Sequence, residues 1–138
     1  MKVIVSACLL GENCKYNGGN NYSQQVVNFV KGREVIPVCP EVMAGLGVPR
    51  TPIEICGDRV ISKDGVDVTE SLIRGVKAIL SQIADEDIEC AILKSRSPTC
   101  GVRQVYDGTF TGTLVPGAGV LTQALTAAGI RVIDSEEV

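Results

Sequence analysis

The 138-residue chain contains no histidine and no tryptophan, and aromatic residues make up only 4% of it. Without histidine it cannot build a Cys–His–Asn protease site, and no imidazole can share a metal with its cysteines. A net charge of −3 argues against the broad basic surface that duplex nucleic acid requires, so we expect no such partner. No segment approaches the roughly 20 apolar residues of a membrane span, so we expect no membrane partner either.

The chain also lacks a Walker-type phosphate loop and a Gly-x-Gly-x-x-Gly fingerprint, so ATP and dinucleotide cofactors are not indicated. The apolar stretch before Cys8 is shorter than the roughly 7–15 apolar residues of a signal peptide. We therefore expect it to be a first strand, and we expect a cytoplasmic location, where cysteines stay reduced. What the chain does have is six cysteines and a hydrophobic fraction of 45%, enough to fill one core.

The order of apolar patterns predicts an α/β fold. Continuous apolar runs predict buried strands at 2–6, 34–38, 90–94 and 130–133, and Gly57-Asp58 predicts a hairpin over 54–62. Helical spacing predicts a helix between Ser23 and Gly32, one from about Val68 to Ile83 capped by Asp67, and one ending at Gly129. The alternation indicates a three-layer sandwich with a mostly parallel, Rossmann-like central sheet. We expect a single domain over residues 1–138, with a small hairpin insertion.

Three of the six cysteines, Cys8, Cys39 and Cys100, follow predicted strands. The carboxyl ends of parallel strands share one rim of a sheet, so we expect these thiols to lie near one another. Three converging thiolates without histidine favour a soft metal centre with one position left open, such as a 4Fe-4S cluster. A structural zinc site usually has four ligands and paired Cys-x-x-Cys knuckles, and the chain has no clear knuckle.

The other three cysteines give weaker signals. Cys56 and Cys90 lie inside apolar strand patterns, so we expect both to fill the core, as free cysteine often does. Cys14 lies in the Gly- and Asn-rich loop 11–22, where a fourth ligand, a neighbouring thiol and an exposed side chain all remain open. We predict that it is not a ligand, because a fourth thiolate would block the open position.

Two residues beside these cysteines are candidates for catalysis. Glu41 lies two residues after Cys39, where a carboxylate can act as a general base, although the position also suits an exposed charge or a helix start. Ser97 precedes Pro98, where its hydroxyl can either pass a proton or simply form a turn. The candidate substrate-binding cations, which can equally be solvated surface charges, are Lys15, Arg50, Lys94 and Arg96.

Six motifs in order resemble the thiouracil desulfidase family, which was first catalogued as a bacterial domain of unknown function. They are Ser6-Ala7-Cys8-Leu9-Leu10-Gly11, Cys14-Lys15-Tyr16-Asn17-Gly18, Cys39-Pro40-Glu41, Gly45-Leu46 with Pro49-Arg50, Lys94-Ser95-Arg96-Ser97-Pro98-Thr99-Cys100-Gly101 and Tyr106-Asp107-Gly108-Thr109-Phe110. Together they span essentially the whole chain. One block usually reads Arg-Tyr-Asp-Gly in the family, and here it reads Lys-Tyr-Asn-Gly from position 15.

The resemblance implies a 4Fe-4S cluster on Cys8, Cys39 and Cys100 with the fourth iron free. It implies hydrolytic removal of sulfur from a thiolated uracil, as base or nucleotide, with release of sulfide and no net redox change. By motif, Glu41 matches the carboxylate proposed to activate water, and Ser97 matches the hydroxyl proposed for proton transfer. A soft thiocarbonyl sulfur also suits an open iron.

Other functions remain open at this point. They are a non-catalytic iron–sulfur protein that transfers electrons or carries clusters, a structural zinc-binding domain, and an open-iron enzyme acting on a dehydration-type substrate. Both 2-thio and 4-thio uracils are candidate substrates, and the sequence leaves the oligomeric state open.

Overall fold

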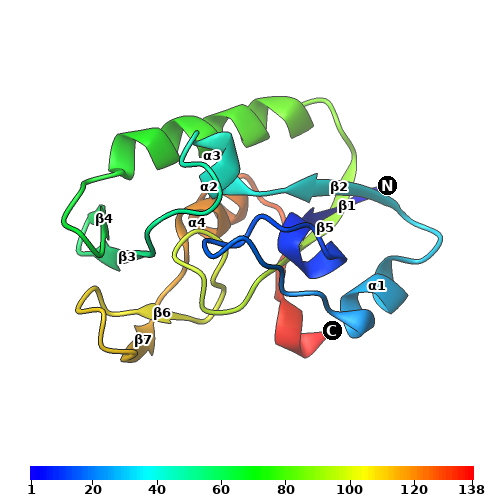
Figure 1. The fold of residues 1–138 in the computed structure, drawn as a ribbon. Coiled ribbons are helices and arrows are strands. Elements are labelled where there is room, and N and C mark those ends of the chain that lie inside the picture. Colours follow the sequence, from blue (N-terminus) through cyan, green and yellow to red (C-terminus); the bar gives the residue numbers. More distant parts are fainter.

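The computed structural model describes all 138 residues and has a four-stranded parallel sheet at its centre (Figure 1). The sheet order is β2-β1-β5-β8. These strands span Glu34–Val38, Lys2–Ser6, Ile88–Leu93 and Val132–Asp134, and each neighbouring pair is parallel. The predicted α/β fold with a mostly parallel sheet is therefore confirmed. None of the helices has the length and apolar character that crossing a bilayer would demand.

Helices cover both faces of the sheet, which gives the fold three layers (Figure 1). On one face, Ile4 of β1 packs in a core with residues of α3 (Thr69–Ile83) and α4 (Val120–Ala127). On the other face, Val3 and Val5 pack with residues of α1 (Gln24–Val30) and of the 3-10 helix η1 (Ala7–Leu10). A strand buried on both faces needs apolar residues at every position, which explains the continuous apolar run at 2–6.

One of the two predicted capping residues is observed at its helix start. Ser23 Oγ accepts the N–H of Val26 at 3.3 Å at the start of α1. At α3 the N-cap residue is Val68, which makes no side-chain cap, so the prediction that Asp67 caps this helix is wrong by one residue; Asp67 Oδ1 still accepts the N–H of Thr69 at 2.9 Å. Strand bounds shift slightly from the prediction, since β5 begins at Ile88 and β8 covers Val132–Asp134.

Two small hairpins lie beside the sheet. β3 (Ile53–Cys56) and β4 (Arg59–Ser62) pair around Gly57-Asp58, as the turn signal predicted. The second hairpin, β6 (Gln104–Tyr106) with β7 (Leu114–Pro116), packs its first strand on β3. The sequence indicated only a turn-rich stretch there, because three-residue strands are too short to show an alternating pattern. Three short helices also lie outside the prediction, namely η1, α2 (Pro40–Met43) and η2 (Ser135–Glu137).

Helix α2 follows Cys39 directly and packs closely on α3. A Cβ atom at Gly75 of α3 would lie 2.8 Å from the carbonyl oxygen of Pro40 and 2.9 Å from the nitrogen of Ala44, so only glycine fits there. Pro40 occupies the first turn of α2, where its missing N–H carries no penalty. The close packing fixes the amino end of α2, which carries Cys39 and Glu41.

Candidate metal centre and active site

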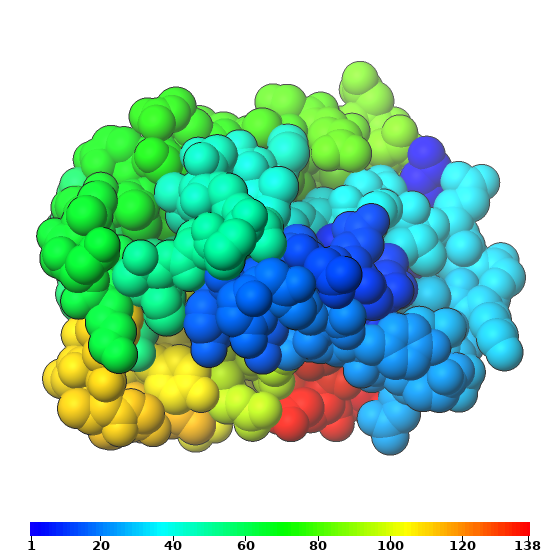
Figure 2. All heavy atoms as spheres, in the orientation of Figure 1, coloured from blue at the N-terminus to red at the C-terminus, as the bar shows by residue number.

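A cavity of about 530 Å³ lies at the carboxyl edge of the sheet. Its walls come from η1, the loop 11–22, the amino end of α2, the segment 94–100 and the two hairpins. In the space-filling view, the blue segment of loop 11–22 lies across the front of the molecule, next to the yellow region of β6 (Figure 2). The cysteines that line the cavity are Cys8, Cys14, Cys39 and Cys100.

Three of these cysteines are placed by the local backbone at the ends of strands. Cys8 lies in η1, immediately after β1. Cys39 is the N-cap residue of α2 and follows β2. Cys100 ends the segment after β5, where its N–H donates to Ser97 Oγ at 3.1 Å. The carboxyl-edge geometry thus brings residues far apart in sequence to one cavity.

The surroundings of the thiols oppose their ionisation. Burial raises the pKa of Cys8, and a hydrogen bond from Asn21 Nδ2 to its sulfur, 3.4 Å long, counters this only in part. Burial raises the pKa of Cys100 to about 12, and burial followed by the charge of neighbouring Cys39 raises that of Cys14 to about 12. All six cysteines of the chain are free. Thiols in such a site become thiolate ligands when a metal cation offsets their charge.

The donor set is soft and suits iron and sulfide better than hard cations. No group of three or more cysteine, aspartate or glutamate side chains converges as the ligands of one metal ion would. The four cysteines therefore line one cavity, but their side chains do not surround one ion position. The volume of the cavity and its uniform sulfur donors suit an iron–sulfur cluster.

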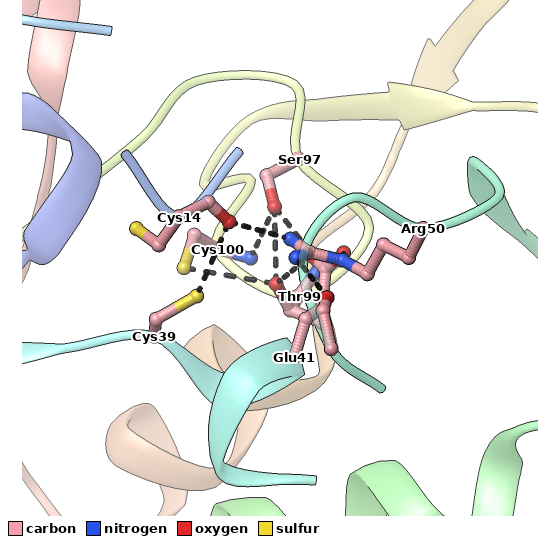
Figure 3. Close-up of polar contacts among 8 residues, drawn as sticks. Cys14, Cys39, Glu41, Arg50, Ser97, Thr99 and Cys100 are labelled. Carbon is pink, nitrogen blue, oxygen red and sulfur yellow. Dashed lines mark hydrogen bonds and ion pairs between the residues drawn. The ribbon is translucent and has the colours of Figure 1, made fainter. Parts of the chain in front are cut away.

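Glu41 is held in the first turn of α2 by two hydrogen bonds (Figure 3). Its Oε1 accepts from Arg50 Nε at 3.1 Å, and its Oε2 accepts from Thr99 Oγ1 at 3.0 Å. The two charged side chains are largely buried, with exposures of 14% for Glu41 and 7% for Arg50. Arg50 also donates to the carbonyl oxygens of Cys14 and Gly47 at 2.8 and 2.9 Å. Arg50 therefore orients the carboxylate and ties it to the loop that carries Cys14.

Ser97 forms the expected turn, and its hydroxyl also contacts Thr99. Its Oγ accepts the backbone N–H groups of Thr99 and Cys100, which makes the turn. The same Oγ lies 3.1 Å from Thr99 Oγ1, and because Thr99 donates to Glu41, the hydrogen of this contact comes from Ser97. Ser97, Thr99 and Glu41 thus form a continuous hydrogen-bonded path beside the sulfurs (Figure 3). The sequence did not single out Thr99, because a threonine hydroxyl carries no spacing signal.

The other three predicted cations also line the cavity, but their partners differ. Arg96, with a φ of 62°, forms a bidentate ion pair with Glu136 at 3.0 and 3.2 Å. The Lys94 ammonium donates to the carbonyl and hydroxyl oxygens of Ser95, and burial, together with the charge of Arg96, lowers its pKa. The Lys15 ammonium lies 5.8 Å from the centre of the Tyr16 ring. Carboxylates thus neutralise Arg50 and Arg96, whereas Lys15 and Lys94 form no ion pair.

The two cysteines expected in the core differ from each other. Cys90 of β5 is 2% exposed and packs between the sheet and α1. Cys56 is only partly buried, and its thiol donates to the carbonyl oxygen of Gly108 at 3.5 Å. Cys56 therefore serves the contact between the two hairpins, and only Cys90 is a core residue.

The fold and the cavity define an α/β protein with a cysteine-lined site at the carboxyl edge of a parallel sheet. The family model for 2-thiouracil desulfurase matches residues 3–137, and the chain belongs to that family. It is 34% identical over 145 residues to the uncharacterized protein YbbK of Bacillus subtilis (strain 168), with 98% of this chain and 96% of YbbK covered. It also matches the solved structure of the 4Fe-4S-dependent thiouracil desulfidase TudS (DUF523Vcz), with a TM-score of 0.90 and 37% identity over 99% of this chain and 92% of that one. The resemblance seen in the six motifs is confirmed.

Proposed function

We propose that this protein is a 4Fe-4S-dependent desulfidase that converts a thiolated uracil to its oxygen analogue and releases sulfide. The observation that carries the proposal is that Glu41, fixed by Arg50 and Thr99, shares one cavity with the three strand-end cysteines. The structurally similar TudS is named for this cofactor and activity. Water adds its oxygen to the thiocarbonyl carbon, the carbon–sulfur bond breaks, and hydrogen sulfide leaves. The carbon keeps its oxidation state, so no reductant is consumed.

Cys8, Cys39 and Cys100 would hold the cluster through their sulfur atoms. When bound, it supplies a Lewis-acidic iron with an open position, which suits a soft thiocarbonyl sulfur. A flat ring would bind in the same cavity. Free thiols and an oxygen-sensitive cofactor suit a reducing compartment, and we propose the cytoplasm.

Glu41 is the better placed of the two carboxylates that line the cavity to act as a base. It lies two residues after Cys39, in the first turn of α2, whereas Glu54 accepts hydrogen bonds from the backbone of the β6–β7 turn. Glu41 would take a proton from the attacking water. Thr99 and Ser97 would then reverse their hydroxyl directions and carry that proton toward the leaving sulfur.

Lys15 and Lys94 would bind the substrate, whereas neither contacts the proposed general base, Glu41. They line the cavity without a carboxylate partner, so a negative group on the substrate would meet uncompensated positive charge there. A nucleotide phosphate is such a group, and the same lysines would add little for a neutral base. Arg50 and Arg96 are already paired with Glu41 and Glu136, so they would orient these carboxylates rather than bind the substrate.

The proposal is tested with anaerobically reconstituted protein and no added reductant. We expect 2-thio or 4-thio uracil, as base or nucleotide, to yield the oxygen analogue with an equal amount of sulfide, and the metal-free protein to yield none. Chromatography of the product and a sulfide assay on the same sample check this. Inactivity of cluster-replete protein on all four substrate types, or a strict need for a reductant, would refute it.

An electron-transfer or cluster-carrier role has one observation in its favour, namely that Cys14 lines the same cavity next to Cys39. In that role a fourth thiolate would complete the coordination. We predict instead that Cys14→Ser keeps its iron, because three strand-end thiolates suffice and the fourth position must stay open. Iron and sulfide analysis after anaerobic purification measures this. Loss of the cluster in Cys14→Ser would favour the electron-transfer role over the enzyme.

A further inference from the structure

Glu54 of β3 is a buried carboxylate on the cavity that forms no ion pair and has no place in the reaction above. Its Oε1 accepts the backbone N–H groups of Gly108 and Phe110 at 3.0 and 3.1 Å. Both donors belong to the turn that joins β6 and β7. A buried carboxylate without a cation is unfavourable unless hydrogen bonds compensate it, and these two charge-assisted bonds do so.

The turn is docked on β3 by more than this carboxylate. Gly108 has a φ of 94°, and a Cβ there would lie 2.7 Å from the carbonyl oxygen of Ile55 and 2.8 Å from Cys56 Sγ. The Cys56 thiol donates to the Gly108 carbonyl oxygen. Within the turn, Asp107 Oδ1 accepts from the N–H and the hydroxyl of Thr109. The turn therefore has one defined position beside β3.

Within this turn, Phe110 has a backbone conformation that a bulky residue rarely adopts. Its φ is 57°, in the left-handed region. Such strain persists where the surroundings impose it, and it gathers at functional sites. Here the N–H of Phe110 is held by its hydrogen bond to Glu54. Phe110 and Tyr106 are the aromatic residues that this hairpin contributes to the lining of the cavity.

We propose that Glu54 is a positioning residue that fixes Phe110 as an aromatic wall for the flat ring of the substrate. The inference rests on the proposed function and adds a source of selectivity to it. Stacking on an aromatic side chain binds a planar heterocycle wherever its sulfur is attached, whereas an acyclic thiocarbonyl compound has no ring to stack. The wall thus favours ring thiones over open-chain thioamides.

The test measures the binding of uracil, which is flat and contains no sulfur, to the cluster-loaded protein by isothermal titration calorimetry. Phe110→Gly removes the ring and suits a φ of 57°, so the backbone stays in place. We expect uracil affinity to fall roughly 5- to 150-fold, the range for one lost base–aromatic contact. Glu54→Ala releases the turn and should cause a similar loss. Glu54→Gln keeps a carbonyl oxygen for both N–H groups and should bind uracil almost as the wild type does.

A double variant separates positioning from direct contact. If Glu54 acts through Phe110, Glu54→Ala combined with Phe110→Gly should bind uracil no more weakly than Phe110→Gly alone. Additive losses would mean that Glu54 touches the ligand itself, and they would overturn the inference. Unchanged uracil affinity in Phe110→Gly would overturn the inference as well, and this result can be interpreted without any Glu54 variant.

Kinetics distinguish failure of this inference from failure of the proposed function. In both single variants the KM for thiouracil should rise more than kcat falls, and any turnover of thiourea should be unaffected. If the wild-type protein desulfurates thiouracil and both variants have the same KM as the wild type, the inference fails and the proposed function stands. A wild-type protein that neither binds uracil nor releases sulfide from thiouracil would defeat both.

Discussion

Replacing Cys8, Cys39 or Cys100 by alanine is expected to abolish cluster retention and desulfuration while leaving a folded chain. Each residue supplies one of three thiolates, and two cannot hold the group in an open cavity. The sheet does not depend on these side chains, because Cys8 and Cys39 are only partly buried and all three follow the strands. Even for Cys100, which is 4% exposed, the lost burial is worth on the order of 1 kcal/mol, well below a typical domain stability.

Iron and sulfide analysis, with absorbance in the iron–sulfur charge-transfer region, measures retention after anaerobic purification. Cys90→Ala is the matched control for Cys100→Ala, because Cys90 is 2% exposed but packs between the sheet and α1, away from the cavity. We expect it to lose stability and keep its iron. Full iron content in Cys100→Ala, or loss of cooperative unfolding in the metal-free variants, would contradict this division between site and fold.

The positions of the strand-end cysteines were predictable because they depend on one general property of parallel sheets. Val3 and Ile4 are fully buried on opposite faces of the sheet, as the continuous apolar run that contains them predicted for a central strand. Once such strands are parallel, the residues that follow them share a rim. Convergence of Cys8 with Cys39 follows from that rule, without knowledge of any side-chain contact.

The polar network of the site was not predictable in the same way. Glu41 and Thr99 are hydrogen-bonded although they are 58 residues apart, and no pattern in the sequence links them. Arg50 and Lys94 look alike in sequence as cations beside motifs, yet one is paired with a carboxylate and the other is not. Such differences arise from the path of irregular loops.

The β6–β7 hairpin shows a second limit of sequence patterns. Besides the pairing of its own strands, its turn is tied to β3 through Glu54 and Cys56. Glu54 lies in the hairpin that was correctly predicted, and a charged residue there is normally expected to be exposed to solvent. Only the structure shows that it is buried and bound to a backbone more than fifty residues away.

Glu41→Gln is expected to keep the cluster and to lower kcat on thiouracil by about 10²–10⁴-fold, the usual contribution of a general base. The amide has the size of the carboxylate but cannot accept a proton from water. Arg50 retains its hydrogen bonds to the carbonyl oxygens of Cys14 and Gly47, so the loop that carries Cys14 should stay in place. Turnover and iron content are measured on the same anaerobic sample, so that a lost base is not confused with a lost cofactor.

Thr99→Val tests the rest of the proton path, because valine keeps the shape of the side chain and removes the hydroxyl that joins Ser97 to Glu41. We expect a smaller fall in kcat than in Glu41→Gln, since Glu41 can still take the first proton. Ser97→Ala is less specific, because it also removes the acceptor of the Cys100 N–H. The control is Glu89→Gln, a surface carboxylate paired with Arg33, which should leave turnover unchanged. Wild-type turnover in Glu41→Gln would eliminate the proposed base and leave the substrate assignment standing, whereas iron loss in that variant would make Glu41 a structural residue of the metal centre.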